Sequence, residues 1–526
     1  MTYNDENTKL PKSSKSLWMN FNDMEDFPTL DEHTEVDVVI VGGGITGITS
    51  AYLLVNEGFK VAILEADKLF TGTTGHTTAK ITAQHSLIYD KFIHSMDIGM
   101  NKAKLYYEKN KDALAFIKET VEENKIDCDF CEQDSYIYAT TEEYRRKLEK
   151  EALAYEKIGI EGGLVDNIPF NITIKNGLVM KNQAQFHPVK YLTHLVQVII
   201  EKGGLIFENT TAVNIKTGDK PSVLTREGAS ITGNYILSCS HFPFYEGAGL
   251  YSTRLHAERS YIIAVKAKDA YPGGMYISAD QPIRSLRSAT IAGEEMILIG
   301  GEGHKTGEGK STLAHFNALE KFGNDVFDIE SIAYRWSAQD LYTLDNIPYI
   351  GAVTLSQPNI MIATGYRKWG MTNGTVAALL FKDILLKKIR VDEHMFGPSR
   401  FHLNPSLKNF LVDNANVAGH LIKGKLEILS KDASDLSTGE GAVITVDGHR
   451  KGAYKDDTGK LHIIDTTCTH IGCEVEWNDG ERSWDCPCHG SRFSYTGEVI
   501  EGPAEKPLQK YDYKMIDNLT SEDSGY

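Results

Sequence analysis

Residues 36–47 read VDVVIVGGGITG, an apolar run of strand length followed by a glycine-rich turn. The β-branched residues of the run predict a buried parallel strand. Gly42, Gly44 and Gly47 have the G-x-G-x-x-G spacing, and the residues that follow them, as far as Glu57, have a helix-like pattern. These glycines allow a tight turn and a close approach of the backbone to a pyrophosphate, which the N–H groups at a helix N-terminus bind. The stretch therefore predicts a dinucleotide-binding turn.

A second strand and an acidic residue follow this turn in the order that a dinucleotide site requires. The strand is expected at residues 60–64, and Glu65 comes 18 residues after Gly47, where it can accept hydrogen bonds from ribose hydroxyls. A lone G-x-G-x-x-G is a weak signal, and an ordinary strand-to-helix turn is the alternative, but the ordered set is specific. The residues predicted to contact the dinucleotide are Gly42, Gly44, Ile45, Thr46, Gly47 and Glu65.

Two short segments near the C-terminus each hold a cysteine and a histidine. They read CTHIGC at residues 468–473 and CPCHGS at residues 486–491. A Rieske 2Fe–2S centre requires this set, because two thiolates hold one iron and two neutral imidazoles hold the other, which raises the potential to roughly −150 to +300 mV. Zinc is the alternative metal for such ligands. The predicted metal ligands are Cys468, His470, Cys486 and His489.

Length and charge limit the class of protein. A chain of 526 residues is expected to fold as two or three domains. Its 55 Lys+Arg and 72 Asp+Glu give a net charge of −17, which disfavours nucleic acid and anionic membrane as partners. No export signal and no apolar run of about 18 residues are visible, so we expect no membrane span and a cytoplasmic location. Four of the seven cysteines lie between residues 468 and 488, which indicates a cofactor site rather than a disulfide-stapled secreted domain.

Further segments indicate that the dinucleotide is FAD. They read LFTGTTGHTTAK at residues 69–80, QFHP at 185–188, DNIPYIG at 345–351 and ATGYRKWGMTNG at 363–374. In this order they resemble the D-amino-acid-oxidase-type FAD-dependent oxidoreductases, over roughly residues 36–390. The resemblance implies that the last segment runs beside the flavin ring, where a helix N-terminus stabilises negative charge. It adds to the expected FAD contacts Thr74, His76, Gly365, Trp369, Gly370 and Met371.

His76 raises a separate question. Some members of the resembled family attach FAD covalently through a histidine in a segment similar to GTTGH, residues 72–76. Here Gly75 stands where those members have a tryptophan. Either His76 carries FAD covalently, or it lines the flavin site.

The C-terminal part, about residues 425–515, resembles Rieske domains of the cytochrome bc type. The segment EGPA at residues 501–504 is similar to the proline loop that covers the cluster in that family, which favours the cluster over zinc. The resemblance implies a disulfide between Cys473 and Cys488, although disulfides are unusual in the cytosol. Ser491 keeps the position of a hydroxyl that bonds a bridging sulfide, whereas Phe493 stands where the bc type has a tyrosine donor to a ligand sulfur. Because such hydrogen bonds raise the potential, we expect a lower potential here.

The order of these motifs predicts the architecture. The fold class is α/β (α+β), a FAD-binding Rossmann-type domain with an inserted mixed-sheet substrate domain, plus a small all-β Rieske domain. A helical pattern at residues 101–123 and strand-like runs at 261–265 and 296–299 belong to the substrate domain. The expected boundaries are 1–35 for an N-terminal extension, 36–395 for the oxidoreductase (dinucleotide-binding segments about 36–100, 180–250 and 340–390; substrate segments about 100–180 and 250–340), 396–420 for a linker and 421–526 for the Rieske domain.

Other motifs carry no functional prediction. Cys128 and Cys131 form a C-x-x-C without a second pair, and on a strand their thiols would face opposite ways, so we interpret them as structural. Residues 301–311 miss the P-loop spacing and are expected to form a turn. A further set of residues could meet a substrate carboxylate or amine, or lie on a surface or domain interface: Arg259, Tyr261, Arg335, Trp336 and Gln339.

The combined motifs predict an FAD-dependent dehydrogenase with its own electron outlet. The family resemblance implies that a small substrate, an amine or N-substituted amino acid, reduces the flavin, and that electrons then pass singly through the Rieske cluster to an unidentified one-electron partner. Two alternatives stay open. Electrons could flow in reverse, from an external donor through the cluster to the flavin, or the chain could be an electron-transfer or redox-sensing module without a small substrate. No residue can be assigned as a catalytic base.

Overall fold

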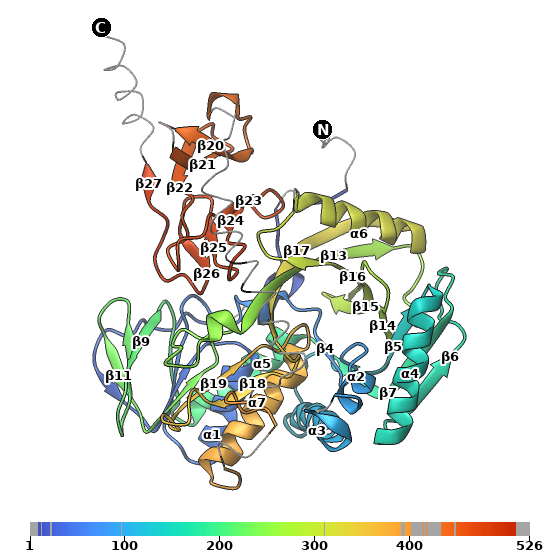
Figure 1. The fold of residues 1–526 in the computed structure, drawn as a ribbon, viewed down its shortest axis with the longest axis horizontal. Helices are drawn as coiled ribbons and strands as arrows, with labels where there is room; N and C mark the ends of the chain where they lie inside the picture. The colour runs from blue at the N-terminus through green and yellow to red at the C-terminus, as the bar shows by residue number, and fades with distance from the viewer. Residues whose placement is uncertain are drawn as a thin grey trace.

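A computed structural model describes residues 9–511 of the chain, except 12, 21–23, 96, 310, 391–394, 401–413, 415–416, 418–432 and 447–448. Most of the expected linker, and the first twelve residues of the expected Rieske domain (421–432), therefore lie outside the described residues. The described residues form five sheets (Figure 1). In that part of the chain, no helix is long and apolar enough to cross a membrane.

The apolar run before the glycine turn forms a central strand of a six-stranded sheet, in the order β18-β19-β12-β2-β3-β8. Only β18 runs antiparallel to its neighbour. Every side chain of β2 and β3 is buried, as expected for parallel strands covered on both faces. Helices α1, α5 and α7 share a core with one face of this sheet. The bounds are β2 Val38–Val41, β3 Val61–Leu64, β8 Leu205–Phe207, β12 Tyr235–Ser238, β18 Tyr349–Ala352, β19 Ile360–Thr364, α1 Ile45–Asn56, α5 Pro188–Glu201 and α7 Gly370–Leu385.

A small four-stranded sheet covers the other face of these parallel strands. Val39 and Val41 of β2 pack there against apolar residues of β9, β10 and β11. This sheet has the order β1-β11-β10-β9. Its bounds are β1 Thr34–Glu35, β9 Ala212–Lys216, β10 Ser222–Thr225 and β11 Ser230–Thr232.

The inserted segments build a mixed nine-stranded sheet, in the order β17-β13-β16-β15-β14-β5-β7-β4, with β6 beside β7. The pairing of β14 with β5 is parallel, and the other pairings are antiparallel. The helix expected at residues 101–123 is α3. The bounds are β4 Lys80–Ile81, β5 Cys131–Ala139, β6 Gly162–Val165, β7 Asn176–Gln185, β13 Leu255–Ala267, β14 Met275–Ser278, β15 Arg284–Ile291, β16 Glu294–Lys305, β17 Ile329–Thr343, α2 Tyr89–Ile93, α3 Gly99–Asn124, α4 Glu142–Ile158 and α6 Leu313–Val326.

The two long strands β13 and β17 present different residues on their two faces. Arg259 lies opposite Gln339, and Glu258 lies opposite Asp340. Because side chains alternate along a strand, these two pairs point to opposite faces of the sheet. The Arg259 face continues into the core beneath α6, which includes Tyr261.

The C-terminal part folds as two antiparallel four-stranded sheets, β20-β21-β22-β27 and β23-β24-β25-β26. In Figure 1 these strands, coloured orange to red, form a small body of their own beside β13 and β17. The fold class expected from the sequence is confirmed. The bounds are β20 Gly441–Val446, β21 His449–Lys455, β22 Leu461–Asp465, β23 Glu476–Asn478, β24 Ser483–Asp485, β25 Arg492–Ser494, β26 Val499–Glu501 and β27 Lys510–Tyr511.

Candidate functional site

The glycine turn after β2 leaves no room for side chains. Gly42 has φ +113°, and a Cβ atom there would lie 2.5 Å from the carbonyl oxygen of Cys239. A Cβ atom at Gly47 would lie 1.9 Å from the carbonyl oxygen of Gly42. Only glycine fits at either position, so the turn presents bare backbone at the start of α1. Such a turn is the part of a dinucleotide site that approaches the pyrophosphate.

Glu65 and Thr74 reach this turn from two other segments. Glu65 Oε2 accepts a hydrogen bond from the N–H of Gly43 at 2.7 Å, and Thr74 Oγ1 accepts one from the N–H of Ile45 at 3.0 Å. Two further segments that the sequence predicted to contact the dinucleotide therefore meet at the glycine turn. The glycine cradle and the acidic side chain fit the adenosine diphosphate half of FAD.

The segment 363–374 lies against the first turn of α1. The hydroxyls of Thr46 and Tyr366 share a hydrogen bond of 3.0 Å, and a Cβ atom at Gly374 would lie 2.8 Å from Thr46 Oγ1. Helix α7 begins at Gly370, directly after Trp369. This arrangement brings Trp369, Gly370 and Met371 to the start of α7, where a helix N-terminus fits an electron-rich ring, and Gly365 lies against Thr343 of β17.

His85, which the sequence analysis did not single out, stacks on Trp369 with ring centroids 5.0 Å apart. Its Nδ1 shares a hydrogen bond with the Tyr106 hydroxyl at 2.7 Å, and its Nε2 lies 2.8 Å from the carbonyl oxygen of Thr82. Burial, and then the charge of Arg367, lower the pKa of His85 to about 3. The imidazole is therefore neutral and its contacts fix the ring of Trp369. No sequence motif marks this histidine.

His76 lies in a short 3-10 helix, Thr73–His76, that runs along β17. Trp336 Nε1 donates to the carbonyl of His76 at 2.9 Å, and Thr73 Oγ1 donates to the carbonyl of Gln339 at 3.1 Å. A Cβ atom at Gly75 would lie 2.4 Å from the carbonyl oxygen of Phe70, so tryptophan has no room here. The departure from the resembled motif thus has a steric cause.

The two cysteine–histidine loops meet in the C-terminal part. Cys468 and Cys486 are buried, and the neighbouring Cys486 thiol lowers the pKa of Cys468. The rings of His470 and His489 lie 5.0 Å apart, and Nδ1 of each is buried without a hydrogen-bond partner among the described residues. Burial, and then His470, lower the pKa of His489 to about 4. Two thiols and two neutral imidazole nitrogens fit a Rieske cluster.

A disulfide between Cys473 and Cys488 joins the two loops. The sulfur of Cys486 also lies within 4.8 Å of both disulfide sulfurs. These three sulfurs are not a ligand set, because a metal is bound by thiolate and a disulfide has none. The hydroxyl of Ser491 contributes to lowering the pKa of Cys468 and accepts from the N–H of Ala504 at 3.0 Å, which ties the second loop to the segment 501–504.

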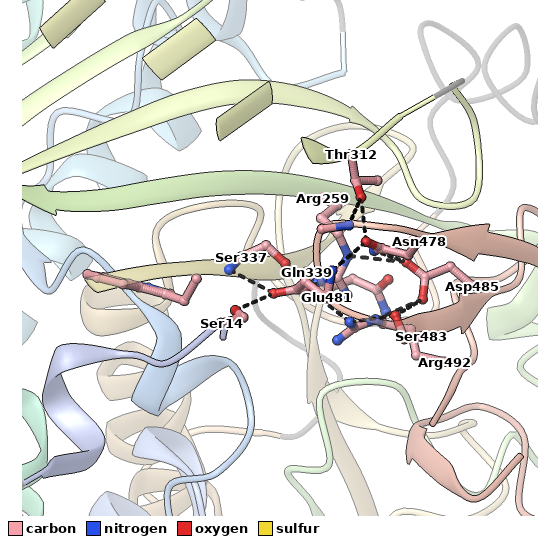
Figure 2. A network of polar contacts seen from close by, with 12 residues as sticks. Ser14, Arg259, Thr312, Ser337, Gln339, Asn478, Glu481, Ser483, Asp485 and Arg492 are labelled. Atoms are coloured by element: carbon pink, nitrogen blue, oxygen red, sulfur yellow. Dashed lines mark hydrogen bonds and ion pairs between the residues drawn. The ribbon is translucent and has the colours of Figure 1, made fainter. Parts of the chain in front are cut away.

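Two arginines and three carboxylates join the C-terminal part to the nine-stranded sheet (Figure 2). Arg259 of β13 is 1 % exposed and pairs with Glu481 at 3.0 Å, Glu501 at 3.4 Å and Asp485 at 3.9 Å. Arg492 of β25 pairs with the same three side chains at 2.6, 2.7 and 3.1 Å. A buried cation of the sheet is therefore enclosed by carboxylates of the C-terminal part.

Glu481 and Glu501 of this network are ionised. Burial alone would raise the pKa of Glu481, but Arg492 and Arg259 lower it to about 2. Glu481 also accepts from the N–H of Ser337 at 3.1 Å and from the hydroxyl of Ser14 at 3.0 Å. Buried ion pairs recover their desolvation cost only with such additional hydrogen bonds. We therefore expect the network to favour one orientation of the two parts.

The second ligand loop lies directly on β13 and β17. Gln339 Nε2 donates to the carbonyl of Gly490 at 2.9 Å, and Gln339 Oε1 accepts from Thr306 Oγ1 at 2.8 Å. Gly490 has φ +80°, and a Cβ atom there would lie 2.5 Å from the Cβ of Ala257. This glycine, next to His489, therefore permits both the turn and the contact.

A second connection starts at the glycine turn itself. Residues 239–242 follow β12, and the carbonyl of Cys239 touches the turn at Gly42. At the other end, the ring of Phe242 lies 6.4 Å from the ring of His470. Between them, His241 Nε2 is buried and has no hydrogen-bond partner among the described residues. Four residues thus span the distance from the phosphate turn to a predicted iron ligand.

The residues that the sequence left unranked do not form one site. Arg259 and Gln339 contact the C-terminal part, the Tyr261 hydroxyl bonds His304 at 2.8 Å, and Trp336 bonds the backbone of His76. The guanidinium of Arg335 lies 4.9 Å from the ring centre of Phe316.

Two other sequence interpretations can be compared with the structure. Cys128 is buried, Cys131 is exposed, and both are free thiols. The prediction of a turn at residues 301–311 is wrong for its first half. Residues 301–305 form the end of β16, because they continue its pairing with β13, and the turn follows at 306–307.

Comparisons with known proteins agree with this arrangement. A model of the family "FAD dependent oxidoreductase" matches residues 37–384, and a model of the "Rieske [2Fe-2S] domain" matches residues 428–512. The Bacillus subtilis protein YhfW, named as a Rieske 2Fe-2S iron-sulfur protein, is 51 % identical over 501 residues, which are 95 % of this chain and 98 % of that protein. Gamma-glutamylputrescine oxidoreductase of Escherichia coli is 22 % identical over 387 residues, 68 % of this chain and 85 % of that protein.

Solved structures with similar folds have lower identity. Glycine oxidase from Geobacillus kaustophilus matches with a TM-score of 0.60 at 18 % identity, over 70 % of this chain and 99 % of that chain. L-proline dehydrogenase from P. horikoshii matches with a TM-score of 0.59 at 16 % identity, over 71 % of this chain and 98 % of that chain. At these identities the likeness shows a shared fold.

Proposed function

The chain belongs to the FAD dependent oxidoreductase family and carries a C-terminal Rieske [2Fe-2S] domain, and from this premise we propose that it is a dehydrogenase with its own electron outlet. When bound, FAD supplies hydride acceptance from a small substrate and release of single electrons, which a 2Fe–2S cluster carries one at a time. The substrate class that we propose is an amine or an N-substituted amino acid. The names of the E. coli and Geobacillus relatives, which refer to gamma-glutamylputrescine and glycine, support this class.

Residues of three segments would hold FAD. The glycine turn would accept the pyrophosphate against the N-terminus of α1, and Glu65 would accept from the ribose hydroxyls. The start of α7 would lie at the flavin ring and stabilise negative charge there. The proposed contacts are Gly42, Gly44, Ile45, Thr46, Gly47, Glu65, Thr74, His76, Gly365, Trp369, Gly370 and Met371.

Four side chains would hold the cluster. Cys468 and Cys486 would bind one iron as thiolates, and His470 and His489 would bind the other through Nδ1, the nitrogen that has no protein partner. The disulfide between Cys473 and Cys488 would keep the two loops together. The hydroxyl of Ser491 would add a hydrogen bond to the cluster environment.

One observation carries the proposal: the second ligand loop is docked on the strand that also contacts the expected flavin segment. Gln339 bonds Gly490 through its side chain and Thr73 through its backbone carbonyl. Transfer between two redox groups requires that the protein hold them close together, and the contact of both segments with one strand supports this. The buried network around Arg259 would hold this geometry without a large domain motion.

The test is anaerobic mixing of the purified holoprotein with a panel of amines and amino acids, followed by flavin absorbance and by the EPR signal of the reduced cluster. We expect one compound to bleach the flavin and to produce the cluster signal. In a Cys468→Ser variant the same compound is expected to bleach the flavin without that signal. A Cys128→Ser variant, which changes a buried cysteine outside the ligand set, is the matched control.

Other outcomes favour other functions. If the panel leaves the flavin oxidised while dithionite reduces both centres, the dehydrogenase proposal fails. Reduction of the flavin by an added donor protein would then support reverse flow, and its absence would support a redox-sensing module.

A further inference from the structure

Strand β14 is shorter than its neighbours in the nine-stranded sheet. It pairs with β15 at Leu286 and Ser285, and with β5 from Ser135 onward. The residues of β15 after Leu286 and those of β5 before Ser135 therefore have no β14 residue between them. A cavity of about 290 Å³ occupies this place, lined among others by Trp18, Gln133, Gln185, His187, Tyr271 and Arg287.

Arg287 is a buried cation in the wall of this cavity and is 3 % exposed. Its Nε donates to the carbonyl of Ser288 at 2.9 Å, and its Nη1 donates to the carbonyls of Thr78 and Ala79, each at 2.8 Å. Among the described residues no bond uses Nη2, and no carboxylate pairs with this guanidinium. Although burial lowers the pKa of Arg287 to about 9, the group remains charged at neutral pH. A buried charge without a counter-ion is costly, so the wall favours an anionic group in the cavity.

Gln185 supplies a hydrogen-bond acceptor in the same cavity wall. Its Nε2 donates to the carbonyl of Ser288 at 3.1 Å, the carbonyl that Arg287 Nε also bonds. Its Oε1 is buried and has no hydrogen-bond partner among the described residues. Because an unsatisfied buried acceptor costs free energy, this oxygen favours a ligand with an N–H or ammonium donor.

The other charged side chains of the wall support this polarity. Asp129 pairs with Lys190 at 2.8 Å, and Glu295 accepts from the N–H of Tyr271 at 3.0 Å. Among the described residues neither acid is paired with Arg287, so the cavity wall holds one cation and two acidic side chains at separate places. A ligand that carries both charges complements such a wall better than a simple anion does.

We propose that this cavity binds a small amino acid, with its carboxylate at Arg287 Nη2 and its amino group at Gln185 Oε1. Arg287 also bonds the carbonyls of Thr78 and Ala79, in the segment that we expect beside the flavin. Binding to Arg287 is therefore linked to the position of that segment. The binding stands by itself, whereas the identity of this ligand as the molecule that is oxidised rests on the proposed function.

Calorimetric titration of the holoprotein with glycine, acetate and methylamine tests the site. Glycine carries both groups, and the other two probes carry one each. We expect glycine to bind more tightly than acetate, and acetate more tightly than methylamine. Arg287→Met is expected to weaken glycine and acetate roughly 10- to 100-fold, because a hydrogen bond to a charged group is lost. Gln185→Leu is expected to weaken glycine and leave acetate unchanged.

The controls separate binding from folding and from turnover. Arg284→Met changes an arginine of the same strand that pairs with Glu302, and it should leave all three affinities unchanged. If Arg287→Met does not fold, Gln185→Leu still tests the site, because the proposal requires that this variant lose affinity for glycine and keep its affinity for acetate. Unchanged glycine affinity in Gln185→Leu, or equal affinity for methylamine and glycine, would overturn the site. Flavin absorbance in the same cell shows whether bound glycine is a substrate or a regulatory ligand, and both results are consistent with the site.

Discussion

The side chain of Gln339 donates a hydrogen bond of 2.9 Å from Nε2 to the backbone carbonyl of Gly490. Gly490 follows His489, a proposed iron ligand, while the carbonyl of Gln339 accepts from Thr73 in the expected flavin segment. The Thr306 hydroxyl holds the other end of the amide at 2.8 Å. One residue of β17 is thus in contact with the segments proposed to hold both cofactors, and we propose that it positions them for electron transfer.

Replacement of Gln339 by leucine is expected to slow electron transfer from flavin to cluster. The change leaves the Gly490 carbonyl and the Thr306 hydroxyl without their partner, at a cost of about 1–3 kcal/mol, so the ligand loop docks less firmly. Light-driven reduction of the flavin, followed by rapid-freeze EPR of the cluster, measures the rate without a substrate. Gln357→Leu, in which the lost partners are the hydroxyls of Tyr245 and Thr354, is the control. An unchanged rate in Gln339→Leu would show that this amide does not position the loop.

Removal of the Arg259 charge is expected to destabilise the docked C-terminal part. In Arg259→Met, Glu481 and Glu501 lose one of the two arginines with which they form ion pairs and keep Arg492. Breaking a buried ion pair in this way costs about 3–5 kcal/mol. Urea unfolding followed by the visible absorbance of the cluster measures the loss. Arg226→Met provides the comparison, because Arg226 makes a single exposed bond to the carbonyl of Glu505. Equal midpoints in the two variants would be inconsistent with a structural role of the network.

The same network predicts that the folded protein loses stability at acidic pH. Burial raises the pKa of Glu481 and of Glu501, but the arginines lower it, and the net pKa of each is about 2 against an ordinary value of 4.5. The unfolded chain therefore binds more protons than the folded protein between these values. The stabilisation is complete above pH 4.5 and is lost as the pH falls toward 2. We expect the difference in unfolding free energy between wild type and Arg259→Met to be largest at neutral pH and to shrink across this window. A difference that stays constant down to pH 3 would contradict the assignment.

The sequence was most informative where the relevant residues lie close together along the chain. Gly42 and Glu65 belong to one strand–helix–strand unit, so their spacing predicts that they meet, whereas Thr74 was expected at the site from the family resemblance. The two cysteine–histidine pairs are equally local. Contacts across long separations leave no such pattern: Arg259 and Glu481 are 222 residues apart, and Gln339 and Gly490 are 151 apart.

Strand pairing explains two further places where the prediction from the sequence was wrong or incomplete. Residues 301–305 have the glycines of a turn, yet they continue β16 because β13 pairs with this stretch as far as Lys305. Arg287 stands in an ordinary strand, and it lines a cavity only because β14 stops early. A propensity or a motif cannot indicate where a neighbouring strand ends.

Substitution of Phe493 by tyrosine is expected to raise the potential of the cluster. Phe493 is fully buried in β25, opposite Trp484, within the core that contains Cys468 and Cys486. A hydroxyl there is expected to donate to a ligand sulfur, and such a bond stabilises the reduced, more negative cluster. A redox titration followed by EPR measures the potential. Phe493→Leu changes the volume of the side chain without adding a donor, so it separates packing from hydrogen bonding. A potential in Phe493→Tyr that is unchanged, lowered or equal to that of Phe493→Leu would rule out the missing hydroxyl as a cause of a low potential.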